Sequence, residues 1–135
     1  MTTAGRMQAE SALSPAPATP RVLVVEDESF LATLIEDILL AAGYRVIKAA
    51  RVDAALEIVR DTELHAALLD INLNGVEVFP VAAELRKRGV PFVFASGYGR
   101  EGLPADFADS LVVQKPYLPD GITAALASSL GRASA

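Results

Sequence analysis

Residues 22–27 read Val-Leu-Val-Val-Glu-Asp, an apolar run that ends in two carboxylates. The run is too short for a helix and rich in β-branched valine, so it predicts a strand that is buried on both faces. Glu26 and Asp27 then lie at the carboxyl end of that strand. Strands of this kind are typical of a parallel sheet covered by helices, so this stretch indicates an α/β fold.

Three further apolar runs also end in a polar residue. They are residues 66–69 before Asp70, 92–95 before Ser96, and 111–114 before Lys115. In an open α/β sheet, ligands bind in the crevice outside the carboxyl ends of the strands. Four expected strands therefore direct polar groups toward one crevice, as a phosphoryl-transfer site would require.

Helical patterns alternate with the strands from Arg21 onward, which is typical of βαβ units. The first helix ends at Gly43 and has an apolar face that is expected to pack on the sheet. The residues of this face are Leu31, Leu34, Ile35, Ile38 and Leu39. The expected helices are 28–42, 52–61, 77–88 and 119–130, and residues 44–49 supply the second of five strands. We expect a three-layer, doubly wound parallel sheet.

One connection departs from this alternation. Gly97, Gly99, Gly102 and Pro104 lie between Ser96 and the last strand. Glycine and proline disfavour a helix interior, so the fourth helix is expected to be short, irregular or absent.

The 135 residues fit one domain, which we place at 21–135 after a Pro- and Ala-rich tail at 1–20 that we expect to be disordered. The 12 Lys and Arg against 17 Asp and Glu give a net charge of −5, without the basic footprint of a nucleic-acid-binding protein. Absence of cysteine excludes disulfides and thiol chemistry. No apolar stretch is long enough for a membrane span or a signal peptide, so we expect a cytoplasmic protein.

This combination of residues resembles the receiver domain of two-component response regulators, over residues 21 to about 131. The resemblance implies the flavodoxin-like strand order 2-1-3-4-5 and a Mg²⁺ site. It further implies that Asp70 accepts the phosphoryl group, that Ser96 supplies a hydroxyl and that Lys115 supplies a cation. The metal would be bound by Glu26, Asp27 and Asp70 and by the main-chain carbonyl of Asn72.

The chemistry of these residues supports each role. Carboxylates about 4 Å apart repel by about 4 kcal/mol at an effective dielectric constant near 20, so Asp27 and Asp70 need a counter-charge. Mg²⁺ is a hard cation that takes oxygen ligands. Asp70 is a suitable nucleophile toward phosphorus, and Lys115 and the metal would neutralise the charge that develops on the phosphoryl oxygens. Ser96 would donate a hydrogen bond to one of those oxygens.

Each residue taken alone also has an ordinary explanation, as a loop charge, a helix cap or a surface lysine. Their joint order at successive strand ends favours the functional interpretation. His65 lacks an identifiable partner for phosphotransfer or metal binding, and Phe79, Phe92 and Phe94 fit a core. Asp70-Ile71-Asn72 also resembles the start of a haloacid-dehalogenase motif, but Asn72 lacks the required acid.

The chain departs from the usual receiver pattern at two places. Leu73-Asn74-Gly75 stands where Met-Pro is usual, and Val112 replaces the switch aromatic. Residues 94–99, Phe-Ala-Ser-Gly-Tyr-Gly, are similar to the Phe-Ala-Thr-Gly-hydrophobic-Tyr motif of stand-alone receivers. We therefore expect Tyr98 to act as the switch aromatic. Since glycines and Pro104 deny residues 97–110 a stable helix, we expect few buried contacts in this segment and mobility without phosphate. We also expect a cis peptide at Lys115-Pro116.

We expect a single-domain response regulator, since no effector domain is expected to follow residue 135. Its partners would be a histidine kinase or a phosphotransfer protein and an unknown downstream protein. It would signal by protein contact or act as a phosphate sink, and it would not be an enzyme beyond its own phosphoryl transfer and autodephosphorylation. The alternative is a phosphorylation-independent protein-binding module of the same fold.

Overall fold

The computed structural model describes residues 19–115 and 119–134. Strands and helices alternate along the chain, with one small hairpin and one 3₁₀ turn among them. The strands are β1 (Arg21–Val25), β2 (Arg45–Ala49), β3 (Ala66–Asp70), β4 (Asn72–Leu73), β5 (Val76–Glu77), β6 (Phe92–Ser96) and β7 (Leu111–Gln114). The helices are α2 (Ser29–Ala41), α3 (Val52–Asp61), α4 (Phe79–Lys87), the 3₁₀ turn η1 (Ala105–Phe107) and α5 (Pro119–Ser134).

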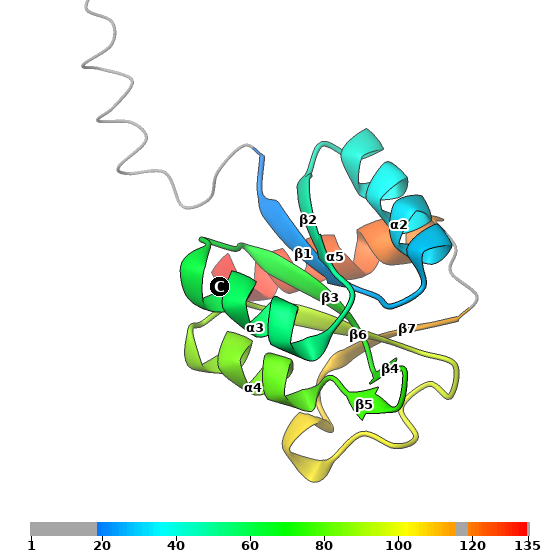
Figure 1. Cartoon of the computed structure of the whole chain (residues 1–135). Helices are drawn as coiled ribbons and strands as arrows, with labels where there is room; N and C mark the ends of the chain where they lie inside the picture. The colour runs from blue at the N-terminus through cyan, green and yellow to red at the C-terminus, as the bar shows by residue number, and fades with distance from the viewer. Residues whose placement is uncertain (1–18, 116–118, 135) are drawn as a thin grey trace, which may run out of the picture.

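The main sheet has five parallel strands in the order β2-β1-β3-β6-β7. Counted along the chain without the hairpin strands, this is the expected order 2-1-3-4-5. The central strand β3 is buried along its whole length, as its uninterrupted apolar sequence predicts. Figure 1 shows the sheet between two layers of helices, so the three-layer α/β expectation is confirmed.

Alternate residues of the strands face two separate apolar clusters. On one face, Val22 and Val24 of β1 pack with Ile35 of α2 and Leu126 of α5. On the other face, Leu23 and Val25 pack with Val59 of α3 and with Val81 and Leu85 of α4. Helices α2 and α5 therefore cover one face and α3 and α4 the other. Burial on both faces holds the strand ends, and the polar groups on them, in a fixed arrangement.

The helix expected at 77–88 begins two residues later, at Phe79. The hairpin of β4 and β5, which the sequence analysis did not predict, occupies the preceding residues. Asn74 and Gly75 form its two-residue loop with φ of 54° and 88°, which is the geometry of a type I′ turn. The sequence feature that indicates this hairpin is the Asn-Gly pair between Leu73 and Val76.

Residues 97–110 contain one turn of 3₁₀ helix, so the expectation of a short or irregular fourth helix is confirmed. We expected few buried contacts in this segment, and that expectation was wrong for its second half. Phe107 is buried in the core cluster and stacks on Phe79, and the guanidinium of Arg86 lies 4.5 Å from the Phe107 ring centre. Arg86 Nη1 also donates to Asp106 O at 2.7 Å.

The helical boundaries otherwise differ from expectation mainly at the end of the chain. Helix α5 continues beyond residue 130, through Gly131 to Ser134. Most of the expected tail, residues 1–18, lies outside the described residues. Among the helices that the structure describes, none has the length and apolar character that a membrane crossing requires.

Candidate functional site

The acidic residues at the ends of β1 and β3 meet in one cluster. Glu26, Asp27 and Asp70 each offer a carboxylate oxygen, and these oxygens lie within 4.8 Å of one another. The cause is the register of the two neighbouring strands, which pairs Val25 with Leu69 and brings the following residues side by side. The sheet therefore collects the three carboxylates that the sequence analysis singled out.

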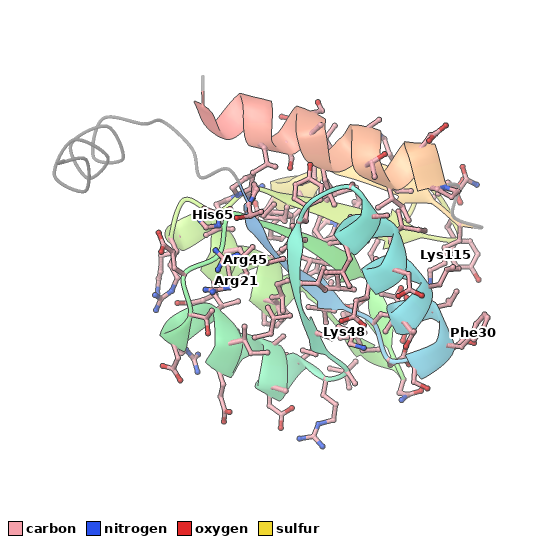
Figure 2. The ribbon with its side chains drawn as sticks, turned by 90° about the horizontal axis from the view of Figure 1, so that it is seen from above. Arg21, Phe30, Arg45, Lys48, His65 and Lys115 are labelled. Atoms are coloured by element: carbon pink, nitrogen blue, oxygen red, sulfur yellow. The ribbon has the colours of Figure 1, made fainter. Side chains whose placement is uncertain are left out.

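Lys115 reaches this cluster from the far side of β6. Its Nζ lies 3.2 Å from Asp70 Oδ1 and 3.8 Å from Glu26 Oε1. The Lys115 amide donates to Ser96 O at 2.9 Å, which extends the parallel ladder to the residue that carries the ammonium. Figure 2 shows Lys115 at the same end of the sheet as Phe30, near the start of α2. One ammonium thus partly neutralises the carboxylates.

Glu26 is the most perturbed of these groups. Its residue is 3% exposed, and its Oε2 accepts a hydrogen bond from the Glu28 amide at 3.2 Å. Burial, and after it the neighbouring charge of Asp70, raise the pKa of Glu26 to about 7, although the Glu28 amide and the Lys115 ammonium act in the opposite direction. A hydrogen bond between the Glu26 and Asp70 side chains adds to this rise in pKa. The cluster therefore favours holding a proton near neutral pH.

These residues fit a divalent cation of the Mg²⁺ type. The donors are all hard oxygens, and they converge from neighbouring strands with the Lys115 ammonium beside them. A bound cation would relieve the repulsion that raises the Glu26 pKa and would displace the proton. Glu26, Asp27 and Asp70 are the side chains that would hold it.

Asn72, proposed to ligate the metal through its main-chain carbonyl, lies at the start of the hairpin. Val78 N donates to Ile71 O at 2.9 Å, so residues 71 and 78 form a hydrogen-bonded pair. Because such pairs alternate along an antiparallel ladder, Asn72 and Glu77 form a non-bonded pair. The Asn72 carbonyl therefore points away from β5 and is available to a ligand.

Ser96 ends β6 and is buried, with a relative exposure of 5%. Its Oγ accepts a hydrogen bond from the Tyr98 amide at 3.0 Å, while the Tyr98 side chain is 79% exposed. Val112, which stands in place of the usual aromatic, is half-buried in the core cluster. The hydroxyl is therefore tied to the backbone of the Tyr98 segment.

His65 lies at the opposite end of the sheet, next to Arg21 (Figure 2). Its Nδ1 accepts a hydrogen bond from the Arg21 amide at 2.9 Å. This bond gives His65 a structural role, in joining the start of β1 to the residue before β3. The four phenylalanines Phe79, Phe92, Phe94 and Phe107 pack edge to face or stacked. The sequence analysis omitted Phe107, because its short polar surroundings gave no periodic signal. The peptide bond expected to be cis, Lys115-Pro116, lies outside the described residues.

Sequence reasoning also missed the apolar surface beside the site. Phe30 and Leu34, one helical turn apart on α2, are 73% and 41% exposed. The sequence analysis placed Leu34 on the buried face of this helix, and the structure corrects that assignment. Phe30 lies in the first turn of α2, at the same end of the sheet as Lys115 (Figure 2).

The fold and the acidic site define a class of protein, and a family comparison agrees with them. The model of the response regulator receiver domain matches residues 22–127. The chain belongs to this family.

Individual relatives are regulators and receiver domains. The transcriptional regulatory protein BaeR of Escherichia coli O6:H1 is 33% identical over 120 residues, which cover 84% of this chain and 49% of BaeR. The aerobic respiration control protein ArcA of Escherichia coli K12 is 30% identical over 120 residues, with 84% and 50% covered. The chain thus spans about half the length of these curated relatives.

Two solved structures are also similar. SdrG from Sphingomonas melonis Fr1 is 38% identical with a TM-score of 0.74, and the match covers 85% of this chain and 99% of SdrG. The receiver domain of sensor histidine kinase PA1611 from Pseudomonas aeruginosa PAO1 is 25% identical with a TM-score of 0.71, covering 84% and 99%. That structure has a magnesium ion coordinated in its active-site cleft.

Proposed function

We propose that this chain works as a single-domain response regulator that accepts a phosphoryl group on Asp70. The strongest support is the position of Asp70 within a cluster of three carboxylates, with the Lys115 Nζ 3.2 Å from its Oδ1. A phosphohistidine on a histidine kinase or a phosphotransfer protein would be the donor. The magnesium ion in the PA1611 receiver domain supports Mg²⁺ as the cofactor.

In the proposed reaction, a carboxylate oxygen of Asp70 forms a bond to phosphorus as the bond from phosphorus to the imidazole nitrogen breaks. The electron pair of the broken bond remains on the imidazole, and the product is an acyl phosphate. Mg²⁺ would neutralise charge on the phosphoryl oxygens when it is bound to Glu26, Asp27, Asp70 and the Asn72 carbonyl. Lys115 would stabilise a second phosphoryl oxygen, and the Ser96 hydroxyl would donate to another.

Output would follow from the connection between Ser96 and the next segment. When the Ser96 hydroxyl turns toward a phosphoryl oxygen, its bond from the Tyr98 amide must lengthen or move with it. Tyr98 would then change the surface beside β7 and α5. This change would be read by a protein partner in the cytoplasm, or the domain would serve as a phosphate sink. We propose no enzymatic activity on other substrates, and no nucleic-acid or membrane partner.

The test is labelling by acetyl phosphate with Mg²⁺, followed by intact mass. Wild type should gain one acid-labile phosphoryl group, whereas Asp70→Asn should gain none and keep its fold by circular dichroism. Asp61→Asn removes an exposed acid at the end of α3, ahead of the start of β3, whereas Asp70 lies at the other end of that strand, so this variant should be labelled like wild type. Undiminished labelling of Asp70→Asn would refute the acceptor assignment. A wild type that is not labelled would favour the phosphorylation-independent binding module instead.

A further inference from the structure

The β4–β5 hairpin begins two residues after Asp70, at the place where the sequence departs from the usual Met-Pro of receivers. We propose that this hairpin positions the Asn72 carbonyl for Mg²⁺, with Gly75 and the Asn72 side chain as positioning residues. This inference rests on the proposed function, since it concerns the metal of the same site. It gives Leu73-Asn74-Gly75, which stand where receivers usually have Met-Pro, a role in positioning the metal ligand.

The direction of the carbonyl is set by the hairpin register. Because residues 71 and 78 are hydrogen-bonded and the loop is closed by the Leu73–Val76 pair, the intervening Asn72 has its N–H and C=O on the outer edge. A shift of one residue in this register would turn the Asn72 carbonyl toward β5. The loop that determines the register therefore determines whether this oxygen is available.

The turn depends on two positive φ angles, 54° at Asn74 and 88° at Gly75. The side chain of Asn72 closes the same turn, since its Oδ1 accepts the Gly75 amide at 2.7 Å. One residue thus carries both the carbonyl proposed to bind the metal and the amide group that fastens the loop. Glycine at 75 and an oxygen acceptor at 72 are the two requirements for this geometry.

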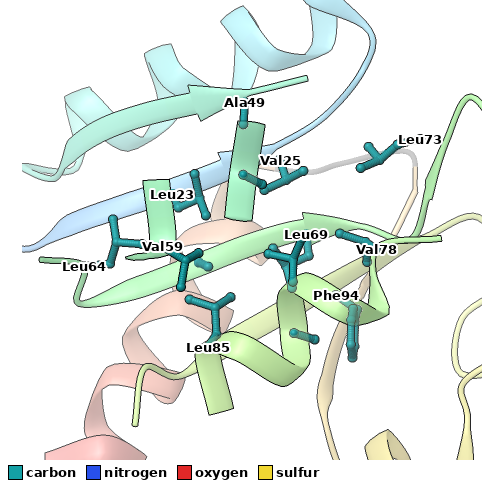
Figure 3. Packing of buried hydrophobic residues seen from close by; sticks show 14 of the residues in the cluster. Leu23, Val25, Ala49, Val59, Leu64, Leu69, Leu73, Val78, Leu85 and Phe94 are labelled. Carbon is teal, nitrogen blue, oxygen red and sulfur yellow. The ribbon is translucent and has the colours of Figure 1, made fainter. Parts of the chain in front are cut away.

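Both ends of the hairpin are held by the core. Leu73 is 3% exposed and Val78 is fully buried, and Figure 3 shows them near Val25, Leu69 and Phe94. The loop between these anchors is exposed. A substitution in the turn therefore leaves the buried contacts unchanged, so its effect on the neighbouring carbonyl is separable from unfolding.

Gly43 provides a matched control for Gly75. Both glycines have positive φ, +95° and +88°, and a Cβ added at either would meet no atom within 4 Å. Gly43→Ala and Gly75→Ala thus introduce the same backbone conflict in open space. They differ in position, since Gly43 follows α2 and Gly75 closes the turn beside the proposed metal ligand.

The experiment measures the Mg²⁺ dissociation constant by calorimetry and unfolding by urea, on the full chain. Gly75→Ala should bind Mg²⁺ about tenfold more weakly than wild type, as losses of supporting contacts at metal sites typically do. Gly43→Ala should bind like wild type despite a comparable loss of stability. Gly75→Asn should recover most of the affinity, because asparagine tolerates the left-handed region that alanine avoids.

Asn72→Ala tests the side chain separately, since it keeps the carbonyl and loses Oδ1, and it should weaken binding about threefold. Equal affinity of the Gly75→Ala and Gly43→Ala variants, with wild type binding Mg²⁺, would overturn the positioning role alone. Failure of wild type to bind Mg²⁺ would overturn the proposed metal site and this inference with it.

Discussion

Three features of the surroundings of Glu26 act on its pKa, and they do not all act in the same direction. It is buried, it is beside Asp70, and its Oε2 already accepts the Glu28 amide. Burial disfavours the carboxylate form, whereas a cation or the Lys115 ammonium favours it. The protonation state of this one side chain therefore couples the stability of the fold to metal binding.

Stability of the metal-free protein should fall as pH rises from about 4.5 to about 7. The native state holds a proton on Glu26 up to its raised pKa of about 7, whereas the unfolded chain releases it near 4.5. The unfolded state binds fewer protons in that window, so the free energy of unfolding decreases, by roughly 1–3 kcal/mol. Urea unfolding with EDTA at several pH values measures the slope. Glu26→Gln should remove it, and an unchanged slope in that variant would assign it to other groups.

Asp27→Asn should weaken Mg²⁺ binding and slow phosphorylation, yet stabilise the metal-free fold by about 1 kcal/mol. The reason is that one of three converging negative charges is lost. Titration calorimetry and urea unfolding in EDTA measure the two effects. Asp37→Asn, which removes an exposed charge later in α2, should change neither. If both variants bind Mg²⁺ as wild type does, Asp27 is not a ligand.

At the scale of elements, the segment 97–110 divides into two parts. Phe107 and the Arg86 guanidinium hold the second part against α4 and the core. The first part is exposed at Tyr98 and Arg100, and Tyr98 N–H bonds to Ser96. Elements with few buried contacts open locally at low cost, so ordering by phosphate should concentrate at 97–103.

Hydrogen exchange tests this switching prediction. Beryllofluoride with Mg²⁺, a phosphoryl mimic, should raise the protection of residues 97–110 in wild type, mainly within 97–103. Tyr98→Ala should show a much smaller rise, because the ring that packs on ordering is missing. Tyr44→Ala provides a control for loss of a tyrosine at a position packed against the other face of the sheet. Equal protection in Tyr98→Ala and wild type would make Tyr98 a surface residue without a switching role.

At the scale of the whole molecule, the acidic crevice adjoins an exposed apolar surface on α2. Phe30 and Leu34 lie one turn apart at the end of the helix nearest the site. In the proposed reaction, a donor histidine would come within bonding distance of Asp70, so the donor protein would also cover the surface around this residue. Exposed apolar side chains beside a reaction site are typical of protein-binding surfaces.

Phe30→Asp should therefore slow phosphoryl transfer from an autophosphorylated histidine kinase about tenfold, which corresponds to about 1.4 kcal/mol. Labelling by acetyl phosphate should stay unchanged, because this small donor needs no docking surface. Leu40→Asp introduces the same kind of charge at an exposed leucine, 51% exposed, near the other end of α2. Transfer rates that fall equally in both variants would point to a general effect on the helix rather than to docking.

Much of the architecture was predictable from local sequence, because four of the five strands of the main sheet carry an apolar run that leads into a polar residue. The valines before Glu26 and the apolar run before Asp70 suffice to expect buried parallel strands. Helix α3 was expected at its observed bounds, since its periodicity is regular over 52–61. The candidate acceptor, ammonium and hydroxyl were likewise marked by their place at strand ends.

Only the tertiary structure decided the distances between the site residues and the conformation of segments without a periodic apolar pattern. Sequence placed Lys115 at a strand end, but the pairing of β7 with β6 and of β6 with β3 sets its Nζ 3.2 Å from Asp70 Oδ1. The anchoring of Phe107 was missed because it depends on contacts with residues distant in sequence, such as Phe79 and Arg86. The β4–β5 hairpin was missed because each of its strands has two residues, too few for an alternating apolar pattern. Local periodicity reports which face of an element is buried, whereas packing between elements determines which polar groups meet.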